Sequence, residues 1–439
     1  MSEKPFYLEG NFSPVDKEVS AFDLDVQGEI PASLQGLFLR NGPNPERGDP
    51  GHWFFGDGMI HAMRLEDGGA SWYRNRYVET KPLRGAPTMA MNDDMTFDYS
   101  VGVSNTHVVT HADKILALVE SSFPCELDRE LNTVGPTDFG GKLNTSFTAH
   151  PKFCPKTGEM LAFGYGFMAP YITYHRFGAD GALLQSEPID VPGSTMIHDF
   201  AVTENHVVFM DLPIVFKPEL VGGGNPFQWD PGYGARLGVM PRTGSNADII
   251  WLEIEPCYVF HPMNAYENDG TIVMDVVRYR EFMSKGPLAS SPGILTRWTI
   301  DTAAGTVKEE TLDDHSTEFP RIDPRCETQP HRFGYGVEAG PGAGLSFKGL
   351  LKYDLEKMTT ESHSFGEGAS PSEGVFVPAS PDAAEDEGYV MAFVHHAQTD
   401  SSEFVILDAQ NFSADPVARV ALPQRVPFGF HGSWSPDPA

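Results

Sequence analysis

Hydrophobic and polar residues alternate along much of this chain, in short runs that end at turn residues. β-Branched and aromatic side chains dominate the runs, and a period of two is typical of strands that bury one face. The runs expected to form strands cover residues 72–78, 107–119, 249–259, 271–279, 374–377, 389–395 and 403–407. The pattern predicts an all-β protein.

Turn residues separate these runs. Hairpin-forming sequences rich in Asp and Gly occur at residues 66–69, 179–181, 268–270 and 304–305, and such pairs favour the left-handed backbone of tight hairpins. Signals for helices are few. Many short antiparallel strands in one chain of this size fit a pair of sandwiches, a large barrel or a propeller.

Length and composition bear on the number of domains. A chain of 439 residues would ordinarily form two or three domains, yet closed all-β architectures often run long as one unit. The 44 glycines and 36 prolines are spread along the chain, which fits many turns better than a linker. We therefore expect a single domain over residues 1–439.

The formal net charge is −30, and no cluster of Lys and Arg occurs. Phosphate contacts need such clusters, so a nucleic-acid partner is not expected. The N-terminal sequence lacks a basic segment followed by an apolar one, and no run of about 18 apolar residues occurs. These features predict a cytoplasmic protein that does not span a membrane.

Four histidines stand in separate apolar settings: His150, His198, His261 and His431. They lie 48, 63 and 170 residues apart, so they can meet only through the fold and not on one helix. A site made of imidazoles, without carboxylate or thiolate ligands, suits a borderline divalent metal such as Fe(II), Zn or Cu rather than Mg or Ca.

The intervals between the histidines favour a propeller over the other all-β architectures. A blade takes roughly 40 to 50 residues or more, and the innermost strand of every blade lines the central channel. Residues from distant blades can therefore meet on the axis. No exact internal repeat is visible, so the spacing does not give the number of blades.

Several short motifs resemble those of the carotenoid cleavage oxygenases, a family that includes the retinal pigment epithelium isomerohydrolase and bacterial lignostilbene dioxygenases. They cover nearly the whole chain in the family's order: residues 38–45 (FLRNGPNP), 56–61 (GDGMIH), 133–135 (TVG), 147–152 (FTAHPK), 198–200 (HDF), 238–242 (GVMPR), 318–321 (EFPR) and 430–432 (FHG). The resemblance implies a seven-bladed β-propeller with a cap of loops and short helices over the metal face. It also implies Fe(II) held by the four histidines named above.

The resemblance also gives three glutamates a role. Family members orient three of the four imidazoles with carboxylates, which fix the tautomer and raise the basicity of the ligand. The matching pairs are Glu120 with His198, Glu318 with His261, and Glu373 with His431. His150 is expected to have no such carboxylate.

The implied reaction is the oxidative cleavage of a carbon–carbon double bond by O2 to give two carbonyl products. Four imidazoles on an octahedral ion leave two neighbouring positions free for chemistry, and no organic cofactor is needed. Thr106, fourteen residues before Glu120, matches the family threonine whose methyl group narrows access to one of these positions.

Two positions bear on the substrate. Lignostilbene-type members carry a lysine directly before the first glutamate, where it contacts a phenolate, but this chain has Val119 there. An apolar side chain cannot pair with a phenolate, which favours a carotenoid or apocarotenoid over a hydroxystilbene. Phe54 aligns with an aromatic residue of the family's substrate tunnel, although Phe55 replaces the usual aspartate after it.

A polyene substrate partitions into bilayers, so peripheral contact with a membrane is expected. The apolar segment from Pro213 to Val221 is a candidate for that contact, with buried packing as the alternative.

Two other functions stay open: non-oxidative isomerisation or ester hydrolysis of a retinoid at the same iron, and a non-enzymatic propeller that binds partners. The oligomeric state does not follow from the sequence.

Overall fold

Strands make up the regular structure of this protein. The computed structural model describes residues 4–220, 226–283, 291–340 and 347–438. Within these ranges the helical segments are all three-residue 3-10 turns: η1 (Phe6–Leu8), η2 (Gly10–Phe12), η3 (Trp53–Phe55), η4 (Pro82–Arg84), η5 (Pro218–Leu220), η6 (Pro231–Tyr233), η7 (Asn246–Asp248), η8 (Pro324–Cys326) and η9 (Ala409–Asn411). The predicted all-β class is confirmed. Across the described residues, none of the helices has the length and hydropathy needed to cross a bilayer.

The chain divides into two compact units. The first takes in residues up to 149, residues 348–350 and residues from 361 onward, and the second takes in residues 150–347 and 351–360. The expectation of one domain over residues 1–439 stays a prediction.

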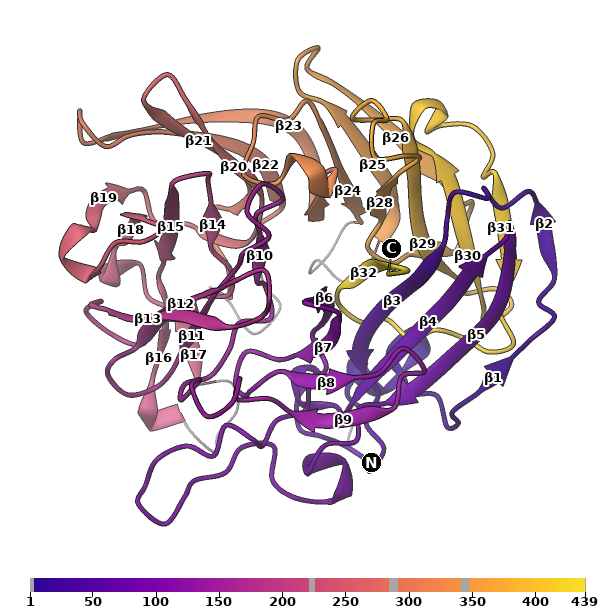
Figure 1. Cartoon of the computed structure of the whole chain (residues 1–439), viewed down its shortest axis with the longest axis horizontal. Helices are drawn as coiled ribbons and strands as arrows, with labels where there is room; N and C mark the ends of the chain where they lie inside the picture. The colour runs from indigo at the N-terminus through magenta and orange to yellow at the C-terminus, as the bar shows by residue number, and fades with distance from the viewer. Residues whose placement is uncertain (1–3, 221–225, 284–290, 341–346, 439) are drawn as a thin grey trace. The chain divides into compact units, whose positions relative to one another are not determined.

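Antiparallel sheets build the first unit (Figure 1). One sheet has the order β1-β5-β4-β3-β32, so the last strand of the chain lies beside β3. Its strands are β1 (Ser20–Ala21), β3 (Gly36–Pro43), β4 (Gly58–Glu66), β5 (Gly69–Tyr77) and β32 (Gly432–Pro436). A second sheet holds β6 (His107–His111), β7 (Lys114–Leu118), β8 (Cys125–Leu127) and β9 (Thr133–Pro136) in sequence order. A third has the order β2-β31-β30-β29-β27, and β28 also pairs with β29: β2 (Val26–Gly28), β27 (Ala369–Pro371), β28 (Val375–Pro378), β29 (Gly388–His396), β30 (Ser401–Asp408) and β31 (Ala418–Ala421).

The second unit is built in the same way. One sheet holds β10 (Lys152–Phe153), β11 (Met160–Tyr165), β12 (Ile172–Phe177) and β13 (Leu183–Ile189). Another has the order β14-β15-β18-β19: β14 (Ala201–Val202), β15 (His206–Asp211), β18 (Ala235–Pro241) and β19 (Ile250–Ile254), while β16 (Ile214–Phe216) pairs with β17 (Phe227–Trp229). The largest sheet follows sequence order from β20 to β26: β20 (Tyr258–Asn268), β21 (Thr271–Tyr279), β22 (Gly293–Asp301), β23 (Thr306–Arg321), β24 (Phe333–Ala339), β25 (Phe347–Asp354) and β26 (Thr359–Ser364). Residues 348–350 of β25 and 361–364 of β26 are counted in the first unit.

The predicted turns join hairpin strands. Asp67 (φ 51°) and Gly68 (φ 73°) connect β4 to β5, and Asp269 (φ 47°) and Gly270 (φ 81°) connect β20 to β21. Two successive residues with positive φ form the turn whose twist matches that of a two-stranded ribbon.

The single strand predicted over residues 107–119 is wrong. The segment is a hairpin, because Ala112 (φ 48°) and Asp113 (φ 62°) turn the chain back between β6 and β7. Neither residue is a glycine or asparagine, so the turn carries no strong sequence signal.

The strand predicted over residues 249–259 is also interrupted. β19 ends at Ile254 and β20 begins at Tyr258. Pro256 lies in the gap, and proline cannot donate a hydrogen bond to a strand ladder. The break separates the edge of one sheet from the strand that carries His261.

Each unit has apolar cores in which side chains of several strands meet. In the second unit, Val208 and Leu237 pack with Met274 of β21, and in the first unit Phe38 of β3 packs edge-on to Phe393 at 5.2 Å between ring centroids. Burial of one such apolar side chain contributes about 1.5–3 kcal/mol to the stability of the folded chain. The strands that carry the histidines are therefore held by packing that does not involve a metal.

Candidate metal centre

Three of the four histidines lie close together in the second unit. His150 precedes β10, His198 precedes β14, and His261 lies within β20. Their ring centroids are 4.4 Å apart for His150 and His198, and 5.0 Å apart for each of the other two pairs. The Nε2 atoms of His198 and His261 are 3.2 Å apart.

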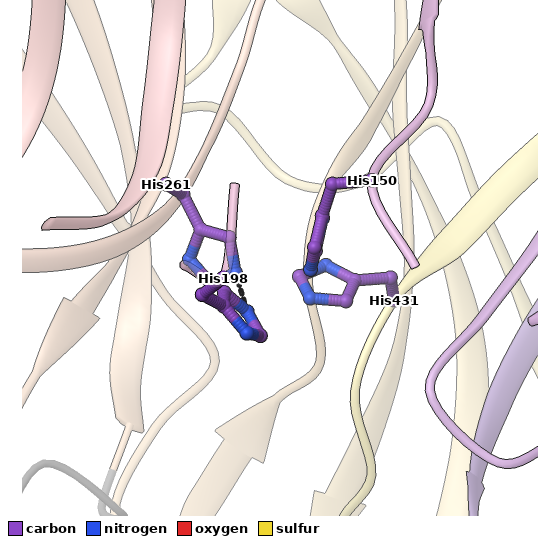
Figure 2. A group of neighbouring side chains, drawn as sticks. All are labelled: His150, His198, His261 and His431. Atoms are coloured by element: carbon purple, nitrogen blue, oxygen red, sulfur yellow. Dashed lines mark hydrogen bonds between the residues drawn. The ribbon is translucent and has the colours of Figure 1, made fainter. Parts of the chain in front are cut away.

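His431 stands immediately before β32 and is held there by its backbone. Its N–H donates to the carbonyl of Thr106 at 3.1 Å, and its carbonyl accepts from the Asn41 N–H at 2.9 Å. The side chain is buried. One ring nitrogen from each of His150, His198, His261 and His431 lies within 4.8 Å of those of the others (Figure 2).

The donor set fits a divalent transition metal. Two imidazole nitrogens that bind one ion at about 2.1 Å and at right angles are about 3 Å apart, which is close to the separation of the His198 and His261 Nε2 atoms. The group contains no carboxylate or thiolate. Four neutral nitrogen donors suit iron, zinc or copper better than magnesium or calcium.

Glu318 of β23 contacts His261 as predicted. Its Oε2 lies 2.6 Å from Nδ1 of His261 and also accepts the Phe319 N–H at 2.5 Å, while its Oε1 accepts the Tyr279 hydroxyl at 2.9 Å. Burial raises the pKa of the Glu318 carboxyl, but the His261 ring and these donors hold it below its ordinary value. Glu318 is thus a buried carboxylate that fixes the far side of the His261 ring.

Glu373 contacts His431 in a similar way. Its Oε1 lies 3.1 Å from Nδ1 of His431, and its Oε2 accepts the Gly432 N–H at 2.7 Å. The carboxylate is 3% exposed, so this pair is shielded from water. Glu120, the third glutamate, is half-buried just after β7, and its pairing with His198 stays a prediction.

The sequence did not point to Asp199 and Lys152, which lie beside the histidines. Asp199 is 2% exposed, and its Oδ2 lies 2.9 Å from Nζ of Lys152 and 3.9 Å from Nδ1 of His150. Its Oδ1 accepts the Phe200 N–H at 2.7 Å. Burial raises the pKa of Asp199, and Lys152 opposes that shift. Asp199 follows His198 directly, and Lys152 stands two residues after His150. The sequence signal for this ion pair was therefore limited to the motifs HPK and HDF.

Thr106 lies beside His431. Its N–H donates to the carbonyl of Leu118 at 2.9 Å, and its hydroxyl donates to Asn105 Oδ1 at 3.1 Å. With the hydroxyl so directed and the carbonyl bound to the His431 N–H, the residue is fixed next to a proposed ligand. Its role in narrowing access to one of the open positions on the metal ion stays a prediction.

The two proposed substrate residues lie in the first unit. Phe54, in η3, is 38% exposed and stands edge-on to Phe430 at 5.6 Å between ring centroids. Its carbonyl accepts from Asn105 Nδ2 at 2.9 Å, which ties η3 to the segment that carries Thr106. Val119 is half-buried directly after β7, close to Gly102.

Comparison with known proteins places this chain in a family. The model of the family described as RPE65, retinal pigment epithelial membrane protein, matches residues 12–436. A carotenoid cleavage oxygenase of Mycobacterium tuberculosis is 41% identical, with 99% of this chain and 98% of the relative covered. An isoeugenol monooxygenase of Pseudomonas putida is 34% identical, with 97% of each covered.

Solved structures agree with this assignment. The lignostilbene dioxygenase of Pseudomonas brassicacearum superposes with a TM-score of 0.90 at 30% identity, covering 99% of this chain and 100% of the other. The cobalt-substituted apocarotenoid oxygenase ACO of Synechocystis superposes with a TM-score of 0.85 at 28% identity and 97% coverage of each. The chain belongs to the RPE65 family, which contains the carotenoid cleavage oxygenases.

Proposed function

We propose that this chain is an Fe(II)-dependent dioxygenase that cleaves a carbon–carbon double bond of a carotenoid or apocarotenoid with O2, giving aldehyde or ketone products. The observation that carries the proposal is the group of four histidine nitrogens within 4.8 Å of one another. It occurs in a chain that is 41% identical to a carotenoid cleavage oxygenase.

In this proposal His150, His198, His261 and His431 hold the iron. When bound, ferrous iron would supply redox chemistry with O2 and open coordination positions. Glu318 and Glu373 accept hydrogen bonds from the Nδ1–H groups of His261 and His431, so each Nε2 presents a lone pair. Glu120 would do the same for His198.

The substrate class rests on apolar residues. Val119 offers neither charge nor hydrogen bond to a phenolate, and the Phe54 ring offers an apolar face. Burying a phenolate against such side chains would cost free energy, because the charge loses its hydration. An apolar polyene carries no charge and has no such cost. The alkene of a carotenoid or apocarotenoid is therefore the proposed reacting group, beside Thr106.

Cleavage of a stilbene or phenylpropenoid alkene is the second candidate. Its support is the similarity to the lignostilbene dioxygenase, with a TM-score of 0.90, and to the isoeugenol monooxygenase. The residues around the histidines would act in the same way in both reactions. Only the contacts that recognise the ends of the substrate would differ.

Peripheral contact with a membrane is proposed for the segment from Pro213 to Val221, whose last residue lies outside the described part of the chain. Ile214 is buried, while Phe216 packs against Phe167 with 4.5 Å between ring centroids. Pro218 is exposed. Insertion at this segment would therefore rest on the exposed turn η5 and not on the strand before it.

The test is to load the protein with Fe(II) without air and then to add air with β-carotene, an apocarotenal or a hydroxystilbene. Mass spectrometry of the aldehydes identifies the bond that is cut, and an oxygen electrode follows O2 uptake. The proposal expects carbonyl products from a carotenoid or apocarotenoid substrate, with matching O2 uptake. Products from the hydroxystilbene alone would favour the second candidate. Turnover of a retinoid ester, added in a separate reaction, without O2 uptake would favour isomerohydrolysis.

A further inference from the structure

The hydroxyl of Tyr279 and the ring of His261 contact different carboxylate oxygens of Glu318. Tyr279 is the last residue of β21 and pairs with Tyr258 across the β20–β21 ladder. It is 6% exposed, and its hydroxyl donates to Glu318 Oε1 at 2.9 Å. The second carboxylate oxygen, Oε2, lies 2.6 Å from Nδ1 of His261. A continuous path of hydrogen bonds thus runs from Tyr279 to His261.

Packing holds the Tyr279 ring in this position. The ring stands edge-on to Phe282 at 5.5 Å and to Phe260 at 6.1 Å between centroids. Phe260 in turn stands edge-on to His198 at 4.9 Å. A ring enclosed in this way has few other rotamers, because a close-packed protein interior leaves no room for them.

The backbone next to Glu318 is arranged to support the same carboxylate. Phe319 has a φ of 51°, a conformation that is uncommon for a residue with a large side chain. In this conformation its N–H donates to Oε2 of Glu318. Such strain persists where the surroundings require it, and it is typical of functional sites.

We propose that Tyr279 is a positioning residue that fixes Glu318 and thereby sets the strength with which His261 binds the metal. This inference rests on the proposed function. Because the Tyr279 hydroxyl donates to Oε1, the Glu318 carboxylate cannot rotate about its terminal bond without losing this buried hydrogen bond to a charged group. Oε2 is therefore kept on Nδ1 of His261, and Nε2 is kept aimed at the metal.

The test is Tyr279→Phe, which removes the hydroxyl and keeps the ring. The matched control is Tyr174→Phe, because Tyr174 is also buried and donates its hydroxyl at 3.1 Å to a backbone carbonyl, that of Arg242. Metal retention is measured by dialysis of the Fe(II)-loaded protein against a chelator without air. The visible absorption of the Co(II)-loaded protein reports the ligand field directly.

We expect Tyr279→Phe to weaken metal retention by about tenfold, the lower end of the range for groups that support a ligand. Its Co(II) spectrum should shift, while circular dichroism stays that of the wild type and Tyr174→Phe behaves as the wild type in every respect. Tyr279→Phe with wild-type retention and spectrum would overturn the inference. An equal loss of metal retention in Tyr174→Phe would also overturn the inference, because the loss of any buried tyrosine hydroxyl would then have the same effect.

A double-mutant cycle tests whether Tyr279 acts through Glu318. In a Glu318→Gln background, Tyr279→Phe should change retention by less than about twofold, since coupled residues are not additive. The same tenfold loss in both backgrounds would overturn the inference. A wild-type protein that binds neither Fe(II) nor Co(II) would overturn the proposed function itself, whereas wild-type binding with an unchanged Tyr279→Phe overturns only this inference.

Discussion

At the scale of single residues, the direction in which an imidazole can bind a metal depends on the atom that its other nitrogen contacts. His261 and His431 each direct Nδ1 at a buried carboxylate, at 2.6 Å and 3.1 Å. These contacts assign the proton to Nδ1 and leave Nε2 as the electron-pair donor. The two carboxylates also offset the charge that four neutral ligands leave on a divalent ion.

Glu318→Gln and Glu373→Gln should each weaken activity or iron retention by roughly 10- to 100-fold while the fold is kept. An amide carries no charge and polarises the imidazole less than a carboxylate does. Iron content and turnover of the purified variants check this, with Glu310→Gln, an exposed position on β23, as the control. Wild-type values for both test variants would reduce these glutamates to structural residues.

The Asp199–Lys152 ion pair predicts an effect on stability. Lys152→Met leaves the Asp199 carboxylate, which is 2% exposed, without its cation. Because Lys152 itself is 17% exposed, we expect a loss of stability below the about 3–5 kcal/mol that removing one partner of a fully buried pair costs. The double variant Lys152→Met with Asp199→Asn should recover most of that loss. Denaturant unfolding measures both, and equal losses in the single and double variants would show that the charge of Asp199 is not the cause.

At the scale of elements, three of the histidines stand shortly before a strand begins, and His261 lies within β20. The segment before β32 illustrates how such a position is fixed: Asn41 on β3 exchanges backbone hydrogen bonds with Phe430 and His431, and its side-chain amide donates to the carbonyls of Ser104 and His107 at 2.9 Å and 2.8 Å. Asn41 is fully buried. One residue of the FLRNGPNP motif thus ties three segments of the first unit together at His431.

The β6–β7 hairpin predicts a change in stability that does not involve the site. Ala112 and Asp113 both have positive φ, which costs an L-residue with a β-carbon about 1–2 kcal/mol. Replacing them by Asn and Gly, the pair preferred in this turn, should raise the free energy of unfolding by about 1 kcal/mol. Gly305→Ala, at a φ of 69°, serves as the opposite control and should destabilise the protein. A lower denaturation midpoint for the Asn-Gly variant would contradict this account.

Much of this element structure could be predicted from the pattern of residues, and the failures have physical causes. The turn at Asp67 and Gly68 was predicted because an aspartate followed by a glycine favours positive φ at both positions. The turn at Ala112 and Asp113 was missed because it contains no glycine and begins with an alanine, which rarely adopts positive φ. The histidines could be identified from their apolar settings. Tyr279 could not, since its role depends on a partner 39 residues away on another strand.

At the scale of the whole molecule, four histidines from positions 150 to 431 contribute to one group of ring nitrogens. The apolar cores that hold their strands contain other residues, such as Phe38 and Met274. The fold should therefore survive the loss of a histidine, and the metal should not. This separation of scaffold from site is the central claim of the proposed function.

Metal analysis of purified, active protein tests that claim most directly. We predict about one iron per chain in the wild type, and no bound iron or activity in His198→Ala and His431→Ala, whose circular dichroism and thermal unfolding stay close to those of the wild type. An active wild-type protein without iron, or a histidine variant that keeps both iron and turnover, would contradict the account.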